Sequence, residues 1–308
     1  MGLTMHVSQS AIHTLIFAGL GIVAIVILTA FWRGSKRQPF AFPKPLEIAI
    51  GFVTNFFDTL GIGSFAPTTS MFKFWRVVPD ERIPGTLNVG HTLPTILEAF
   101  AFIAIVQVDP VTLVSLIAAS VVGAWVGAGV VARWPRRYVQ IGMGGALLAA
   151  GILFAMQAAH RIPGGGDAIG VTGPLLAFAI VANFCLGALM TIGIGLYAPA
   201  MILVTMLGMN PRAAFPIMMG SCAFLMPIAS LRFIKFDAFS MRASLGLALG
   251  GLPGVAIAAY IFKGLPIEAV RWLVVAVVVY ASVVMIRSAV VERRKNAETD
   301  YLATPAQP

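Results

Sequence analysis

Long apolar runs dominate this chain and constrain what it can fold into. They cover approximately residues 11–32, 46–75, 83–106, 110–132, 138–158, 174–207, 213–234, 243–262 and 267–290. A helix of about 20 apolar residues crosses the roughly 30 Å of bilayer hydrocarbon. Because 59% of the residues are apolar and only 11% are charged, the sequence predicts an all-α integral membrane protein, a polytopic helix bundle.

Two of these runs contain nearly the same nine-residue phrase. Residues 59–67 read TLGIGSFAP, and residues 191–199 read TIGIGLYAP. Glycine weakens a helix and proline removes a backbone donor. Each of these two runs is therefore predicted to be two short helical pieces that meet at a break inside the bilayer. The pieces either re-enter from one face or cross as short tilted helices, and both possibilities stay open.

The Lys and Arg residues distinguish a hairpin from a single crossing at each broken run. With hairpins and an external N-terminus, 17 of the 21 basic residues lie inside and 4 outside, whereas single crossings give 12 and 9. Because cytoplasmic loops carry the excess of Lys and Arg, the sequence predicts hairpins, seven full spans, an external N-terminus and a cytoplasmic C-terminus. The basic excess is thus assigned to a membrane face, and no nucleic acid partner is predicted.

A constant offset of 132 residues relates the two halves of the chain. It pairs Gly61 with Gly193 and Pro67 with Pro199. The first repeat starts inside and the second outside, so the repeats are predicted to be inverted, each a broken hairpin plus three spanning helices. The predicted units are an N-terminal helix with a basic connector (1–44), repeat 1 (45–158), an external linker (159–173), repeat 2 (174–290) and a cytoplasmic tail (291–308), which is polar and expected to be disordered. Inverted repeats with broken helices are typical of secondary transporters.

The two breaks predict a binding site for a small anion near the middle of the membrane. The Gly-Ile-Gly turns expose backbone N–H groups, and the half-helices that follow present positive N-terminal ends. No Lys or Arg falls in the middle of any run, so dipoles and hydroxyls would hold the anion; close helix packing is the alternative role for small residues of this kind. The candidate substrate-binding residues are Thr59, Gly61, Gly63, Ser64, Asn88, Thr191, Gly193, Gly195 and Ser221.

Three ionisable residues within the runs are candidates for proton or ion coupling: Asp58, His91 and Glu98. A charge at a helix centre costs about 2.5 to 3.5 kcal/mol on insertion scales, so each needs a partner or a function. Asp58 either binds a coupling cation or proton, or caps the next half-helix. His91 and Glu98, seven residues apart on one helix face, either flank one relay or are satisfied by neighbouring helices. Their repeat counterparts are not acidic or basic, so coupling is predicted to lie on repeat 1.

Other polar and small residues are assigned to structure. Glu47 is expected to be an interfacial carboxylate near Lys44. The glycines spaced four apart, Gly123 with Gly127 and Gly250 with Gly254, predict tight helix packing. Cys185 and Cys222 show no metal-binding spacing and are expected to be packing residues, so no metal and no cofactor is predicted.

The duplicated phrase and its surroundings resemble the sulfite exporter TauE/SafE family, within the 4-toluene sulfonate uptake permease superfamily. The stretches GFVTNFFDTLGIGSFAPTTSMF (51–72) and ANFCLGALMTIGIGLYAPAMIL (182–203) carry the resemblance, which spans about residues 45–287. It implies a bacterial inner-membrane carrier for sulfite, sulfonates or related sulfur oxyanions, often one that exports sulfite.

The sequence thus predicts a secondary transporter, an exporter of a small sulfur-containing anion, that works by alternating access between its repeats. Its predicted partners are the anion, the lipid bilayer and a coupling proton or cation, and a homodimer is compatible with the sequence. The alternatives are a proton-coupled importer of an organosulfonate or other small organic anion, and a passive anion channel. An enzyme acting on a lipid-linked substrate would need a convergent acid, base or metal set, and the runs contain no obvious one, so no enzymatic activity is predicted.

Overall fold

The computed structural model describes residues 2–35, 38, 41–130, 136–159, 161, 166–190 and 195–303. The regular elements in this part of the chain are helices, as predicted. They are α1 (Gly2–Ser35), α2 (Pro45–Thr59), α3 (Phe65–Phe74), α4 (Ile83–Ile105), α5 (Pro110–Val130), α6 (Arg136–Ala158), α7 (Gly173–Met190), α8 (Tyr197–Met206), α9 (Ala214–Lys235), α10 (Met241–Gly264) and α11 (Ile267–Ala303), with short 3₁₀ turns η1 (Asp80–Arg82) and η3 (Pro211–Ala213).

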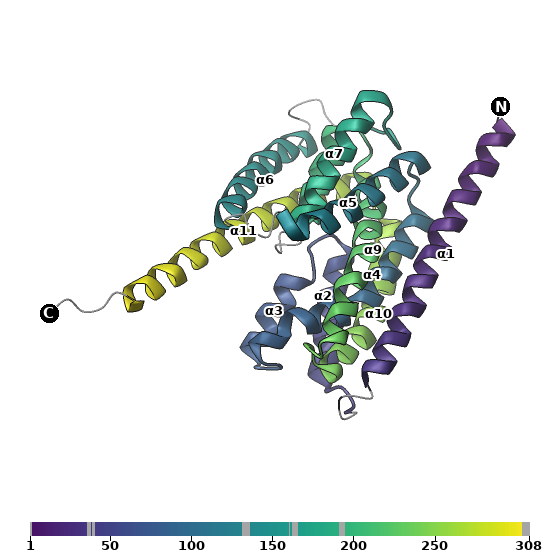
Figure 1. Cartoon of the computed structure of the whole chain (residues 1–308). Helices are drawn as coiled ribbons and strands as arrows, with labels where there is room; N and C mark the ends of the chain where they lie inside the picture. Colours follow the sequence, from purple (N-terminus) through teal and green to yellow (C-terminus); the bar gives the residue numbers. More distant parts are fainter. Residues whose placement is uncertain are drawn as a thin grey trace.

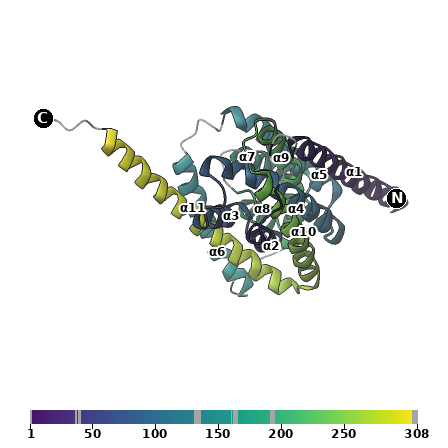
Figure 2. The ribbon, with the colours of Figure 1, turned by 90° about the horizontal axis from the view of Figure 1, so that it is seen from below.

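An antiparallel pair, α4 and α9, forms the centre of the bundle (Figure 1). Thr92 Oγ1 and Ser230 Oγ lie 2.8 Å apart near one end of the pair. Towards the other end, the rings of Phe102 and Phe215 stack with centroids 5.1 Å apart. Around this pair, α10 packs against α2 and α4, and α5 packs against α7 and α9. Seen from below, α1 and α11 extend on opposite sides of the bundle, with α6 beside α11 (Figure 2).

Six helices in the described residues are long and apolar enough to cross a membrane. Five of them were predicted as full spans. The sixth, Gly173–Met190, was predicted as the first half of a broken hairpin; its 18 residues extend about 27 Å, so this half is nearly as long as the hydrocarbon layer. Large apolar side chains point outward, including Leu15, Ile22, Trp125 and Tyr260, which are 62% to 81% exposed. Such a surface suits contact with lipid tails.

The first broken run returns to the end of the bundle from which it starts. At the start of α2, Glu47 Oε1 accepts from Arg242 at 2.9 Å, at the beginning of α10. After α3, Arg82 donates to the carbonyl of Phe239 at 3.3 Å, in the α9–α10 turn. Because both ends of the α2–α3 segment contact the same turn, this segment is a hairpin. Glu47 lies at that end, as expected, but it is buried and paired with Arg242, and its Oε2 accepts from the backbone N–H of Lys44.

The second broken run also returns, but at the opposite end of the bundle. After α8, the N–H of Asn210 donates to the carbonyl of Ala168 at 2.9 Å, just before α7 begins. This end also holds the α4–α5 connection, where the N–H of Asp109 donates to the carbonyl of Ile169 at 2.8 Å. Helix α4 runs from the first end to the second, so the two hairpins enter the bundle from opposite ends. Inverted repeats require this arrangement, while the boundaries of the repeats stay a prediction.

The C-terminal segment differs from the expectation of a disordered tail. Helix α11 continues to Ala303, so the expectation is wrong for residues 292–303. The segment ERRKNAETDYLA contains several good helix formers and neither glycine nor proline, and it follows directly from a spanning helix, which removes the cost of starting a new one.

Glycines allow the closest helix contacts on both sides of the centre. A Cβ atom on Gly250 of α10 would overlap the carbonyl oxygen of Ile48 in α2, and one on Gly123 of α5 would overlap the carbonyl oxygen of Phe184 in α7. Gly254 faces the carbonyl oxygen of Phe52 in the same way. The predicted packing role is confirmed for these three glycines. Gly127 belongs to the residues whose side-chain surroundings the structure does not describe.

We expect Gly250→Ala to destabilise the protein by about 1–3 kcal/mol, because the added methyl group forces α2 and α10 apart. Thermal unfolding of the detergent-purified protein measures the effect. Gly145→Ala is the matched control, since a Cβ atom there meets nothing within 4 Å. Equal unfolding temperatures for the two variants would contradict the packing role.

Candidate functional site

The first break lies between Thr59, where α2 ends, and Phe65, where α3 begins. Gly61 has a φ of 96° and Gly63 a φ of 88°. This left-handed region is open to glycine at little cost and strained for other residues. The two glycines of the phrase therefore form the turn that separates the half-helices, as the sequence predicts.

The first break contacts the second repeat through Gly61. A Cβ atom at this position would overlap Cε of Met201 in α8, and it would lie 3.6 Å from Met218 and 3.7 Å from Phe215 in α9. In contrast, a Cβ atom on Gly63 would meet nothing within 4 Å. Gly61 is thus a packing contact of the first break with α8 and α9, whereas open space remains beside Gly63.

Only the last residues of the second break lie within the described part of the chain. Thr191 and Gly193 lie outside the described residues. Gly195 is exposed, and a Cβ atom there would meet nothing within 4 Å. Helix α8 follows, with Leu196 at its N-cap and no side chain bonded to that cap. The N-terminal end of α8 therefore adjoins open space.

Asp58 and Ser64 bond to each other across the first break. Ser64 Oγ donates to Asp58 Oδ2 at 2.8 Å, and both side chains are buried. Ser64 is the N-cap residue of α3, so the carboxyl group of Asp58 lies at the positive end of that helix. This geometry favours the capping role for Asp58 among the two alternatives, and it occupies the Ser64 hydroxyl.

One face of α4 carries three buried polar side chains, His91, Thr95 and Glu98, at spacings of four and three residues. His91 Nδ1 lies 3.0 Å from Asn55 Oδ1 of α2, and His91 Nε2 lies 3.0 Å from Thr68 Oγ1 of α3. Neighbouring helices therefore occupy both ring nitrogens, which favours the alternative of a satisfied histidine.

Glu98 is the acidic end of this face. Its Oε1 accepts from Thr59 Oγ1 at 2.9 Å, at the last residue of α2. The outer two members of the face thus contact the first hairpin, and Thr95 between them points the same way. A predicted substrate-binding residue, Thr59, is therefore hydrogen-bonded to a predicted coupling residue, Glu98.

Three buried polar atoms near the centre lack a hydrogen-bond partner within the described part of the protein. They are Thr95 Oγ1, Glu98 Oε2 and Ser221 Oγ. Burying such atoms without a partner costs about 1–3 kcal/mol each. Native membrane proteins tolerate polar groups of this kind where they face a cavity or bind a ligand. Ser221 was predicted to bind substrate, whereas Thr95 was missed.

Helices α8 and α9 add Tyr197 and Cys222 to the neighbourhood of Glu98, with the Tyr197 hydroxyl close to the Glu98 carboxyl group. Tyr197 is the first residue of α8, and Cys222 lies on α9, with its Sγ 3.9 Å from Met190 Sδ at the end of α7. Sequence reasoning missed both. A signal existed for Tyr197: at the offset of 132 it aligns with Phe65, so the second copy of the phrase gains a hydroxyl at that position.

Asn88 lies apart from this cluster. It is half-buried on α4, nearer the start of the helix than His91, and its amide donates to the carbonyl of Pro84 at 2.9 Å. Ten residues, about 15 Å of helix, separate it from Glu98. The structure therefore brings Thr59 and Glu98 together, with Asp58 next to Thr59 in the chain, but leaves Asn88 towards one end.

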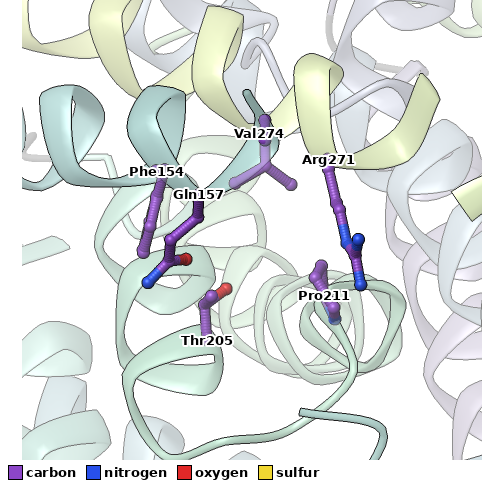
Figure 3. A pocket seen from close by; sticks show the side chains of 7 residues that line it. Phe154, Gln157, Thr205, Pro211, Arg271 and Val274 are labelled. Atoms are coloured by element: carbon purple, nitrogen blue, oxygen red, sulfur yellow. The ribbon is translucent and has the colours of Figure 1, made fainter. Parts of the chain in front are cut away.

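A small cavity of about 20 Å³ lies elsewhere, between α6, α8 and α11 (Figure 3). Its polar lining consists of Gln157, Thr205 and Arg271. A cavity of this size holds about one water molecule. None of the predicted site residues lines it, so it is separate from the candidate site at the breaks.

We expect Asp58→Ala to lower stability by about 0.5–2 kcal/mol, because the buried Ser64 hydroxyl loses its acceptor and the positive end of α3 loses its acidic neighbour. Asp58→Asn keeps an oxygen that accepts from Ser64, so it should unfold close to the wild-type temperature. Thermal unfolding in detergent tests both variants. The double variant Asp58→Ala/Ser64→Ala should lose little more than Asp58→Ala alone, since both changes remove one bond; additive losses would argue against the cap.

Comparison with known proteins assigns the chain to a family. The sequence model of the family described as sulfite exporter TauE/SafE matches residues 2–154 and 175–307. No curated protein and no solved structure matches the chain significantly. The two matched segments contain both breaks and nearly all of the described helices, which confirms the resemblance found in the sequence. The chain therefore belongs to the sulfite exporter TauE/SafE family, and it is a membrane transporter of sulfite or related sulfur anions.

Proposed function

We propose that this chain exports a small sulfur-containing anion, sulfite or an organosulfonate, across the bacterial inner membrane. The observation that carries the proposal is the meeting of two hairpins from opposite ends of the bundle, through Gly61 and Met201. Beside this contact lie buried polar atoms that have no hydrogen-bond partner among the described residues. Backbone that is not helical is tolerated at membrane depth where it is buried in protein or lines a cavity. A substrate between the hairpins would satisfy these groups.

Alternating access follows from the same arrangement. One hairpin reaches the site from each end, so tilting one repeat against the other would open the site to one side and close it to the other. The contact of Gly61 with α8 and α9 lies on the surface along which the repeats would move.

The predicted residues take different parts in this proposal. Gly63, Gly195, Thr59 and Ser221 border the substrate, together with Thr191 and Gly193. Asp58 and Ser64 hold the start of α3, and Asn88 lies on the approach from one end. Among the coupling candidates, Glu98 is the strongest, because its Oε2 has no partner in the described part of the protein, whereas the ring nitrogens of His91 are both occupied.

A proton-coupled importer would use the same site, and the buried carboxyl group of Glu98 supports this second function. The two functions differ in direction and driving force. An exporter moves sulfite down its own gradient or with the membrane potential, whereas the importer needs an inward proton gradient to accumulate substrate.

We expect purified protein in proteoliposomes to give saturable sulfite flux that liposomes without protein lack. Gly195→Leu should lower this flux about tenfold, because its side chain fills the open space at the start of α8, a change equivalent to roughly 1.4 kcal/mol. Gly145→Leu is the control, since its position also meets nothing within 4 Å but lies on α6, away from the breaks.

Unchanged flux in Gly195→Leu would contradict the proposed site, and absence of flux in the wild-type protein would contradict the proposed function. Accumulation of substrate that depends on an inward proton gradient would identify the importer instead.

We propose that the N-terminus and the 159–173 linker are external and that the α2–α3 hairpin opens to the cytoplasm. Cysteines introduced as Asp167→Cys and Asp80→Cys, in a Cys185→Ser background, test this orientation. In intact cells a membrane-impermeant maleimide should label the first variant, and it should label the second only after permeabilisation, because the two positions lie at opposite ends of the bundle. The reverse pattern would show the opposite orientation.

A further inference from the structure

We infer that the site takes its substrate as a monoanion, so that sulfite is carried as hydrogensulfite while the sulfite and sulfate dianions are excluded. This inference rests on the proposed function and deepens it by naming the charge state of the substrate.

The charged and titratable groups near the site supply no positive charge for a dianion. Facing Glu98 are Asp58 from the first hairpin, Tyr197 from α8 and Cys222 from α9, with His91 two turns away on α4. Among the buried residues of the described part there is no Lys or Arg. Burying a charge without an opposite charge costs several kcal/mol, so a site without a buried Lys or Arg disfavours a second negative charge on the substrate.

The helix ends near the site also supply little positive charge. A helix N-terminus carries about half a positive charge. The end of α3 already faces Asp58, which bonds to Ser64. The end of α8 has no side-chain cap, and the repeat counterpart of Asp58 is the uncharged Met190. One free half-charge therefore faces the open space beside Gly195, which suits a monoanion better than a dianion.

Two hydroxyls and one carboxyl oxygen near the site have no hydrogen-bond partner among the described residues. Thr95 and Glu98 are on the α4 face that meets the first hairpin, and both are at most 1% exposed. Ser221 is fully buried beside Cys222 on α9. The two hydroxyls can donate to oxyanion oxygens, and the free oxygen of Glu98 can share one proton with the anion. Hydrogensulfite offers both kinds of group: oxygens that accept and one acid proton.

Flux into proteoliposomes at fixed, subsaturating substrate tests this inference. Sulfite is compared with methanesulfonate, a monoanion without an acid proton, from mildly acidic to alkaline pH across the second ionisation of sulfite. Sulfite flux should fall about tenfold for each pH unit above that ionisation, because the hydrogensulfite fraction does, while methanesulfonate flux stays within about twofold. Excess methanesulfonate should inhibit sulfite flux and excess sulfate should not.

The outcomes separate two kinds of failure. Sulfite flux that persists at alkaline pH, or inhibition by sulfate as strong as by methanesulfonate, would overturn the monoanion inference and leave the proposed function intact. A parallel fall of both fluxes would also overturn it, because groups of the protein would then cause the pH dependence. No flux of either anion at any pH would overturn the proposed function itself.

A matched pair of variants tests the role of Thr95. Thr95→Val keeps the shape and removes a hydroxyl that bonds to none of the described residues, so the unfolding temperature should not fall. The KM for sulfite should rise about tenfold through loss of a hydrogen bond to a charged group. Thr54→Val is the control, because the buried Thr54 hydroxyl bonds to the Ile50 carbonyl within α2; it should leave KM unchanged. An unaltered KM in Thr95→Val would remove Thr95 from the site.

Discussion

The interruption of a helix inside the bilayer is the constraint on which the rest of this structure depends. Every backbone group left without a helical partner at that depth costs several kcal/mol unless protein or substrate surrounds it. Here the first break contacts α4 through Thr59 and contacts α8 and α9 through Gly61, with Asp58 at the start of α3. The central α4–α9 pair is thus both the core of the fold and the wall of the site.

The two halves of the chain contribute different polar groups to the candidate site. The first contributes Asp58, His91 and Glu98, whose side chains bond to Ser64, Asn55, Thr68 and Thr59. The second contributes an uncapped helix end at α8, the Ser221 hydroxyl and Tyr197. Two hairpins that enter from opposite ends of the bundle therefore hold an asymmetric set of polar groups. In the proposed transporter, the first repeat would handle protons and the second would present the positive helix end to the anion.

Much of the fold was predictable because the membrane limits the choices. Apolar runs specified the helices, and the Gly-Ile-Gly phrase specified the first break. The distribution of Lys and Arg favoured hairpins at both breaks. The contacts of Arg82 and Asn210 place these two hairpins at opposite ends of the bundle. Thr95 and Cys222 were not predictable, because a threonine or cysteine in an apolar helix looks the same whether it packs or faces a site. The helix that continues to Ala303 was missed because its polar sequence lacks the apolar pattern used to find spans.

The sequence by itself determined which segments lie in the membrane, where two of them break, and that no cationic side chain falls in the middle of a run, because hydropathy, glycine conformation and charge placement are local properties. Only the tertiary structure decided what each polar group does. It paired Asp58 with Ser64 and His91 with Asn55 and Thr68. It left the hydroxyls of Thr95 and Ser221 and the Oε2 atom of Glu98 without a hydrogen-bond partner in the part of the chain that it describes. A hydrogen bond depends on which atoms come within about 3 Å, and here the packing of helices distant in sequence sets those distances.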